Sequence, residues 1–213
     1  MRFLFVYGLM CMATSGAVPE KERVNNLINE ELILAAFKCD FGKVSECFAK
    51  GADAKYQRTS YDKTRFPMRD GGYSVLSSFS WTALMALSWC RGPAEDQIKI
   101  AKLLLENGAD IDHADYAGGT CLHCAIMTEK TELVLFLLDR GANPNTALTA
   151  YIDEIPGETP LHCATVRSDL LVGRLIKAGA NVNARNSKGE SPLDYAKGRY
   201  ERSAQILRRA GGK

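Results

Sequence analysis

The chain has 213 residues, of which 46% are hydrophobic and 24% charged, a composition typical of a folded protein rather than of a disordered segment. The 27 Lys and Arg nearly balance the 25 Asp and Glu, so the formal net charge is +2, and no run of five basic residues offers a footprint for nucleic acid. No stretch approaches the roughly 20 apolar residues that span a bilayer as a mature helix, and seven Cys are too few for a small scaffold built on disulfides.

The first 17 residues have the pattern of a cleavable signal peptide. A short positive start precedes an eleven-residue, largely apolar run at 3–13, and small residues follow at Ser15 and Ala17. A run of this length is typical of an export signal and too short for a membrane anchor. It lacks the helical alternation of the alternative, a buried N-terminal helix. We therefore expect cleavage after Ala17 and export. The segment 18–28 is expected to be a linker or the start of the N-terminal cap, leading into the first helix.

The rest of the chain consists of repeats. Four segments open alike, with a hydroxyl residue followed two positions later by Leu, and they begin at Thr82, Thr120, Thr159 and Ser191. Four segments end alike, with apolar residues before a Gly-Ala-Asp or Gly-Ala-Asn turn, and their glycines are Gly51, Gly108, Gly141 and Gly179. The intervals between these glycines are 57, 33 and 38 residues, which indicates a period of 33 with insertions.

This pattern resembles the ankyrin repeat, because both the opening and the closing half of the motif recur in step. The resemblance covers about residues 29–211. It implies an all-α fold, an ankyrin-repeat solenoid of stacked antiparallel helix pairs with β-turn and finger loops. The five implied repeats lie at about 29–54, 80–112, 118–145, 157–183 and 189–211.

Each motif position has a physical role in such a solenoid. The hydroxyl residue caps the first helix of a pair, and Pro160 and Pro192 occupy the first helical position, where the missing N–H costs nothing. The Leu of the opening points into the stack, and the Gly takes the left-handed conformation that ends the second helix. One pair cannot bury its apolar face alone, so stability comes from stacking.

Two finger loops are longer than the pattern requires. The first carries a long inserted loop at about 55–81, which holds six aromatic residues with four basic residues between them. Aromatic and Arg residues anchor protein interfaces, but such a loop can equally fold back and bury its aromatics against the repeats. The sequence leaves both readings open. The finger before Thr159 is longer by six residues and contains Tyr151.

The His and Cys residues of the motif raise the question of chemistry. His123-Cys124 and His162-Cys163 lie at equivalent places of two repeats, and the resemblance implies that each His forms hydrogen bonds around its helix start. Stacked helices lie about 10 Å apart, so the pairs do not converge on a zinc ion with bonds of about 2.0–2.3 Å. We expect no catalytic residue, no metal and no cofactor. The alternative is a metal-handling or catalytic protein that uses these positions.

The pairing of the remaining cysteines is undecided at this point. Cys39 and Cys90 both fall near the ends of first helices, and an inserted turn follows Cys90, so the two residues could approach each other. Cys124 and Cys163 lie on successive repeats, beyond the Cα separation of about 4.4–6.8 Å that a disulfide needs. Free buried thiols are the default expectation, and a Cys39–Cys90 disulfide is the alternative.

An ankyrin array is a scaffold, so its function lies in the surface that it presents. The resemblance implies protein–protein binding at the concave face. Mapping the repeat onto this chain gives the expected contacts as Trp89, Asp115, Tyr116, Met127, Tyr151, Val166, Arg167 and Arg185.

We expect a non-enzymatic, exported and monomeric module that binds an unknown protein partner through this concave face and the long fingers. Its role would be that of a stabiliser, chaperone or immunity-type inhibitor, in the periplasm or secreted if the source is bacterial. We expect no binding to nucleic acid and no stable membrane insertion after cleavage. A further alternative is an effector that is secreted by a bacterium and acts in a host cell.

Overall fold

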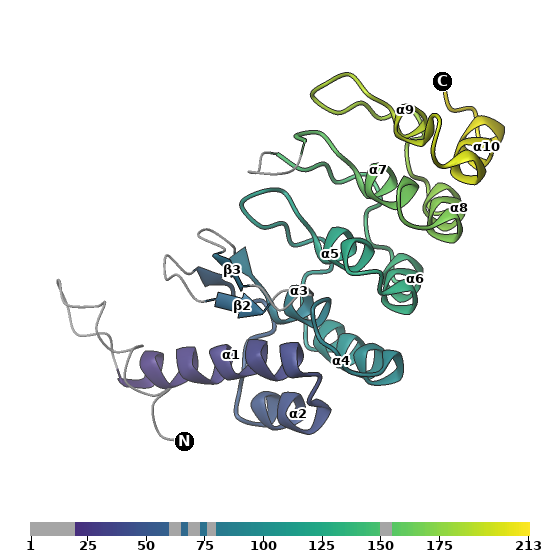
Figure 1. The fold of residues 1–213 in the computed structure, drawn as a ribbon. Helices are drawn as coiled ribbons and strands as arrows, with labels where there is room; N and C mark the ends of the chain where they lie inside the picture. Colours follow the sequence, from purple (N-terminus) through teal and green to yellow (C-terminus); the bar gives the residue numbers. More distant parts are fainter. Residues whose placement is uncertain (1–19, 60–64, 68–72, 76–79, 150–154) are drawn as a thin grey trace.

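The computed structural model describes residues 20–59, 65–67, 73–75, 80–149 and 155–213. These residues form an array of stacked helix pairs, so the predicted helical solenoid is confirmed (Figure 1). The inner helices are α1 (Glu20–Lys38), α3 (Ala83–Leu87), α5 (Cys121–Met127), α7 (Pro160–Thr165) and α9 (Pro192–Ala196). The outer helices are α2 (Phe41–Ala49), α4 (Ala94–Glu106), α6 (Thr131–Asp139), α8 (Asp169–Lys177) and α10 (Glu201–Arg209).

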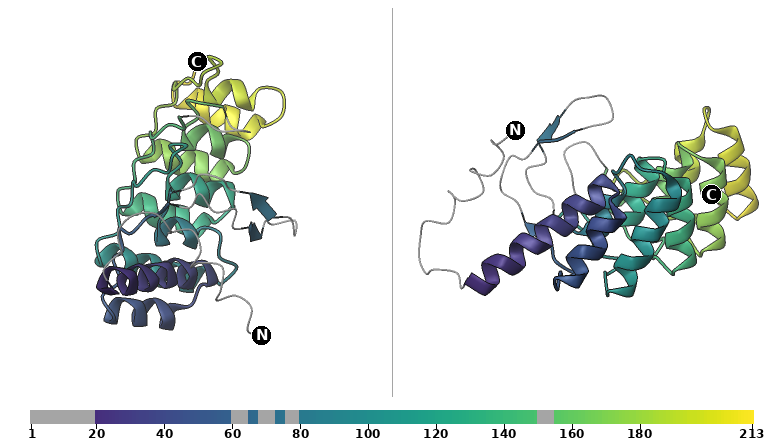
Figure 2. Two further views of the ribbon diagram at one scale, coloured as in Figure 1. Left: turned by 90° about the vertical axis from the view of Figure 1, so that its left-hand side faces the viewer. Right: turned by 90° about the horizontal axis from the view of Figure 1, so that it is seen from below.

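The helix pairs stack in chain order. Each inner helix contacts the next inner helix, and each outer helix contacts the next outer helix, from α1 and α2 at one end to α9 and α10 at the other. The two further views in Figure 2 show the same row of pairs from the side and from below. Within the described ranges, no helix has the length and apolar character needed to cross a membrane.

The first helix begins earlier than expected. The segment 18–28 was expected to be a linker or the start of the N-terminal cap, and the structure shows helix rather than linker from Glu20 onward, because α1 begins there and continues for 19 residues into the first repeat. It contains neither Gly nor Pro, and two acidic residues in its first turn favour the positive end of the helix dipole. Its second half buries Leu32 and Ile33 against the array, and the long N-terminal half extends beyond the other helices (Figure 1).

The repeat motif performs the roles predicted from the sequence. The opening leucines Leu84, Leu122, Leu161 and Leu193 are all buried. The four turn glycines have φ between 84° and 90°, a left-handed conformation that other residues rarely adopt. At the start of α3, Thr82 Oγ1 accepts the Met85 N–H at 3.3 Å, which caps that helix.

The inserted loop forms short strand pairs at its base. Strand β1 (Arg58–Thr59) pairs antiparallel with β4 (Ser80–Trp81), and β2 (Arg65–Pro67) pairs antiparallel with β3 (Tyr73–Val75). In Figure 1 the β2–β3 pair stands on the side of the array where the finger loops project.

Contacts with the first two repeats hold this base in place. Glu30 on α1 accepts the Tyr56 hydroxyl at 3.2 Å and pairs with Arg58 at 3.1 Å. Trp81 is 6% exposed, and the centroid of its ring lies 6.0 Å from that of Trp89. The base of the inserted loop therefore packs against the repeats, as one of the two interpretations predicted. The loop aromatics Tyr61 and Phe79 lie outside the described residues.

Candidate functional site

The finger loops share one hydrogen-bonded turn. Two positions after each turn glycine stands an Asp or Asn, whose side-chain oxygen accepts a backbone N–H two residues further on. The Lys55 N–H donates to the Asp53 side chain at 2.8 Å. The other three bonds, each 3.0 Å long, are donated by Asp112 to Asp110, by Asn145 to Asn143 and by Asn183 to Asn181. Such Asx turns hold the backbone of each finger in the same shape.

A second set of hydrogen bonds joins successive fingers, and we call each of them a rung. The residue four positions after a turn glycine reaches across with its side-chain oxygen to accept a backbone N–H of the next loop. Asp112 accepts from Asn143 at 2.8 Å, Asn145 from Asn181 at 2.7 Å, and Asn183 from Lys213 at 2.9 Å. The rungs therefore couple the second finger to the third, the third to the fourth, and the fourth to the C-terminal loop.

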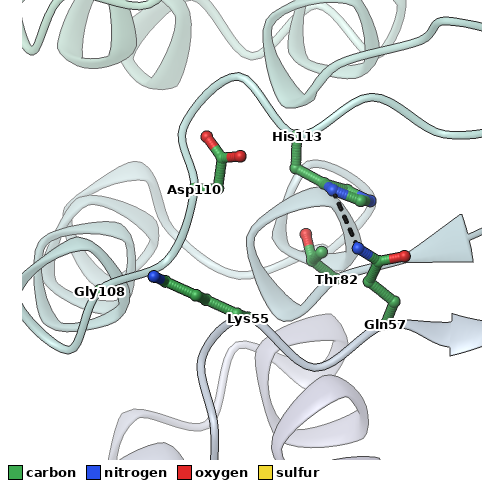
Figure 3. Close-up of a pocket in the computed structure, with 6 residues that line it drawn as sticks. All are labelled: Lys55, Gln57, Thr82, Gly108, Asp110 and His113. Carbon is green, nitrogen blue, oxygen red and sulfur yellow. Dashed lines mark hydrogen bonds between the residues drawn. The ribbon is translucent and has the colours of Figure 1, made fainter.

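The rung between the first and second fingers is missing. Lys55 stands at the fourth position there, and a Lys side chain offers only donors and no acceptor. Among the described residues, the N–H of Asp110 consequently has no side-chain acceptor of the kind that the other fingers provide. At this place the surface is hollowed by a recess of about 360 Å³, lined by Lys55, Gln57, Thr82, Gly108, Asp110 and His113 (Figure 3).

The recess brings polar groups of both fingers together. The Lys55 side chain runs past Gly108, so that a Cβ added there would lie 3.8 Å from Lys55 Cε. Gln57 Nε2 and His113 Nδ1 lie 3.4 Å apart and bridge the two fingers (Figure 3). Within the described part of the chain, the Lys55 ammonium group has no ion-pair partner and His113 Nε2 has no hydrogen-bond partner. The recess is thus lined by the Lys55 cation and the Asp110 carboxylate, and the rung acceptor found between the other fingers is missing beside it.

The predicted contact residues fall into two separate rows. Trp89, Met127 and Val166 each follow the capping Thr of their repeat by seven residues, at the far ends of α3, α5 and α7. All three are half-buried, and Arg167 next to Val166 is exposed. The fingers lie at the opposite ends of these helices. Because an α-helix rises about 1.5 Å per residue, the length of each inner helix separates the two rows. The two rows therefore flank the inner helices rather than form one cluster.

Trp89 contributes more to packing than its place in the predicted contact set implied. Its ring is tilted by 35° against that of Trp81, and its indole nitrogen is buried without a partner among the residues described. The ring packs against Trp81 at the base of the inserted loop and is only half-buried. Its contribution to partner binding stays a prediction.

The predicted finger residues differ in what their side chains do. Asp115 accepts the N–H groups of Ala117 at 2.9 Å and Gly119 at 2.8 Å, so its carboxylate holds its own finger together, while burial raises its pKa. Tyr116 is 63% exposed and free to contact a partner. Arg185 is exposed and donates to the Gly189 carbonyl oxygen at 2.6 Å. Tyr151 lies outside the described residues.

The two motif histidines cap helices, as the resemblance implied. His123 Nδ1 accepts the Thr120 N–H at 3.3 Å, and His162 Nδ1 accepts the Thr159 N–H at 3.1 Å. The proton of each neutral ring therefore lies on Nε2, and that of His162 donates to the Glu190 carbonyl oxygen at 3.1 Å. Burial lowers the pKa of both rings, that of His123 to about 4. No three potential metal ligands gather anywhere in the described ranges.

Sequence reasoning missed the recess, although its signal was present. Aligning the fourth position after each turn glycine places Lys55 beside Asp112, Asn145 and Asn183. That comparison marks the first finger as different. It does not show that a cavity results, because the cavity depends on how closely the two fingers approach each other.

Comparisons with known proteins agree with this architecture. The family model for "Ankyrin repeats (3 copies)" matches residues 32–147, and that for "Ankyrin repeat" matches residues 156–187.

Several curated proteins are similar to parts of the chain. It is 40% identical over 91 residues to the B-cell lymphoma 3 protein homolog of Mus musculus, which covers 42% of this chain and 19% of that protein. It is 33% identical over 111 residues to the human ankyrin repeat and SOCS box protein 11, covering 52% of this chain and 32% of that protein. The Variola virus ankyrin repeat protein OPG189 is 35% identical over 108 residues, covering 48% and 18%. The chain thus spans less than a third of the length of each of these relatives.

Proposed function

Because the chain belongs to the ankyrin-repeat family, whose repeats mediate protein–protein interactions, we propose that it is a non-enzymatic module that binds one partner protein. We place the contact at the finger face, which we define as the finger loops together with the recess between the first two fingers. The missing rung is the observation that carries this proposal, because it leaves binding groups unused at a position where every later finger uses them internally.

The recess is suited to an acidic side chain of the partner. A carboxylate placed there would take the position of the missing rung oxygen beside the Asp110 N–H and would pair with the Lys55 ammonium group, which offsets its repulsion by the Asp110 carboxylate in the same recess. A hydrogen bond to a charged group contributes about 1.5–3 kcal/mol once water is excluded, whereas an exposed ion pair alone contributes about 0–1 kcal/mol. Tyr116, three residues after His113 on the same finger, adds an exposed aromatic ring of the type that dominates interfaces.

The first test compares two variants that lose the same charge. Lys55→Asn supplies the missing oxygen and removes the cation, so we expect it to form the absent rung with the Asp110 N–H and to weaken partner binding by at least about tenfold. Lys102→Asn removes an exposed cation from the outer helix α4 and is the matched control. The partner is first recovered by affinity purification from the native compartment, with the protein as bait. Its affinity for the wild type and for each variant is then measured by calorimetry. Equal affinity for wild type and Lys55→Asn would show that the recess is not the contact.

We also propose that the protein is exported and acts outside the cytosol as a stabiliser, chaperone or immunity-type inhibitor. The support is the signal-like pattern of the first 17 residues, which lie outside the described part of the chain. Mass measurement of protein from its native source should find a chain that begins at Val18. An intact chain in the cytosol would contradict export while leaving the binding surface untouched.

A further inference from the structure

The turn between α1 and α2 holds Cys39 in a defined position. Helix α1 ends with Cys39 N donating to Ala36 O and Asp40 N donating to Ala35 O, both at 3.0 Å. Cys39 has a φ of 58°, so it occupies the left-handed position that closes this type of helix end. The backbone on both sides of the thiol is therefore fixed by hydrogen bonds.

The corresponding turn of the second repeat is longer and equally well held. Between α3 and α4 it contains Cys90 and Gly92, and the buried side chain of Gln97 donates to the Gly92 carbonyl oxygen at 2.7 Å. A Cβ added to Gly92 would collide with the Cys39 side chain, only 2.5 Å from Cys39 Cβ. The absence of a side chain at Gly92 thus lets Cys39 of the first repeat rest on the turn of the second.

This approach brings two thiols together. Cys90 lies two residues before Gly92 in that turn, and its thiol is close enough to raise the pKa of the Cys39 thiol, although the two residues belong to different repeats. Cys90 is buried and Cys39 is half-buried. In contrast, the Cys121 thiol donates to the Leu84 carbonyl oxygen at 3.2 Å and lies 3.3 Å from Ser88 Oγ. All six described cysteines are free thiols in this structure.

We propose that Cys39 and Cys90 are a dithiol that closes to a disulfide and joins the first two repeats of the array. The inference is independent of partner binding. It assigns a covalent modification site to residues that lie away from the finger face.

The reaction needs an external oxidant, and a low-molecular-weight disulfide such as glutathione disulfide suffices. One cysteine thiolate attacks a glutathione sulfur, forms a mixed disulfide and releases one glutathione thiolate. The second cysteine thiolate attacks the protein sulfur of that mixed disulfide, forms the Cys39–Cys90 bond and releases the other glutathione thiolate. The two cysteines lose two electrons, glutathione disulfide gains them, and the two thiol protons end on the two glutathione molecules.

The environment of the pair sets when this reaction takes place. Burial, together with the neighbouring Cys90 thiol, raises the pKa of Cys39 to about 12, so the folded dithiol contains little of the reactive thiolate. The bond therefore forms while the chain folds, before the turn is buried, and is afterwards shielded from exchange. Oxidising compartments outside the cytosol provide such conditions.

The cross-link would act on the weakest part of a repeat array. A terminal repeat has only one neighbour, so it separates from the stack more easily than an internal repeat. A bond between residues 39 and 90 would hold the first repeat on the second and close the segment that contains the first finger and the inserted loop. It would also restrict the unfolded chain.

The test refolds the full chain from guanidinium in a buffer of reduced glutathione and glutathione disulfide, followed by alkylation and peptide mass mapping. We expect one cross-linked peptide pair containing Cys39 and Cys90, with the other cysteines alkylated. The thermal midpoint should lie about 5–10 °C higher than after reduction. Full alkylation of both residues, pairing of either with another cysteine, or an unchanged midpoint would overturn the proposal.

Two variants and one further measurement keep this result interpretable. Cys124→Ser should keep both the cross-link and the raised midpoint, whereas Cys39→Ser should lose both. The equilibrium between dithiol and disulfide is also measured on the wild type against glutathione, in native buffer and in guanidinium. Because folding brings the two thiols together, the equilibrium constant for forming the disulfide should be at least about tenfold larger in native buffer than in guanidinium. Equal or weaker preference in native buffer would refute the inference even if a variant fails to fold.

Discussion

The same helix-capping position is filled by different residues along the array. His123 and His162 accept the N–H of the preceding Thr, and in the last repeat Asp194 accepts the Ser191 N–H at 2.8 Å. A charged carboxylate fits there because Asp194 is also paired with the exposed Lys197, whereas the buried positions require a neutral ring. At the residue scale, burial therefore decides which acceptor a repeat can use.

This burial makes stability depend on pH. An unfolded His takes up a proton near pH 6.5, while folded His123 does so only near pH 4, so unfolding binds a proton between these values. The stabilisation is complete above about pH 6.5 and is lost as the pH falls toward 4. For His123 alone we expect a loss of about 2 kcal/mol between pH 7 and pH 5.

His123→Asn tests this dependence, because the Asn oxygen can still accept the Thr120 N–H but does not titrate. Urea unfolding at pH 7 and pH 5 should show a smaller loss of stability in the variant than in the wild type. His162, whose pKa is also lowered by burial, accounts for part of the loss that remains. An identical pH dependence in both proteins would contradict the assignment.

A second residue-scale prediction concerns the stacking core. Leu161 is completely buried between neighbouring helices, so Leu161→Ala should lower the free energy of unfolding by about 2–5 kcal/mol. Tyr116→Ala removes an exposed ring and should change stability by less than about 0.5 kcal/mol. Denaturant titration of the two variants measures both values. Similar losses of stability in the two variants would mean that the sides of the repeat assigned to the core and to solvent are wrong.

At the scale of elements, the helices are too short to be stable by themselves. Helix α9 has five residues and α7 has six, well below the roughly 12–15 residues at which an isolated helix becomes marginally stable. Their stability therefore comes from packing against neighbouring repeats and from the rungs between fingers. The missing rung at Lys55 is a local weakening of this coupling on the surface that we assign to partner binding.

The rungs provide a prediction at this scale. Asn145 accepts the Asn181 N–H at 2.7 Å and donates to the Gly179 carbonyl oxygen at 3.0 Å, so Asn145→Ala removes both bonds between two fingers. We expect a loss of about 1–2 kcal/mol and faster hydrogen exchange at the Asn181 N–H.

Asn107→Ala is the control for this change, because Asn107 donates only within its own helix, to the Leu103 carbonyl oxygen at 2.8 Å. It should leave the exchange of the Asn181 N–H unaltered. Unchanged exchange at Asn181 after Asn145→Ala would show that the rung does not couple the fingers.

At the scale of the whole molecule, the two ends of the array are built differently. The last outer helix buries Ala204 and Leu207 and exposes Arg208 and Arg209, as expected of a terminal repeat with a polar outer face. The first inner helix is much longer and leaves Leu27 exposed. The last repeat of the array thus has a polar outer face, whereas the first repeat forms the base against which the inserted loop is held.

The repeat architecture can be predicted from the amino-acid sequence, because the signals for it are local. A hydroxyl residue before a helix, a Leu two positions later and a Gly at its end each act within one repeat, and their period specifies the stacking. The buried leucines, the left-handed glycines and the capping histidines could all be predicted in this way. The extent of α1 could not, although its composition favours a helix from Glu20 onward.

Contacts between groups of different repeats, in contrast, could be found only in the folded array. The recess needs the separation of two fingers, and the burial of Trp89 needs Trp81 from the far end of the inserted loop. The approach of Cys39 to the turn that holds Cys90 and Gly92 needs two turns in register. Residues that are neighbours only across the stack leave no periodic signal in the chain. Their approach depends on how closely whole repeats pack, which is a property of the assembled array rather than of any one motif.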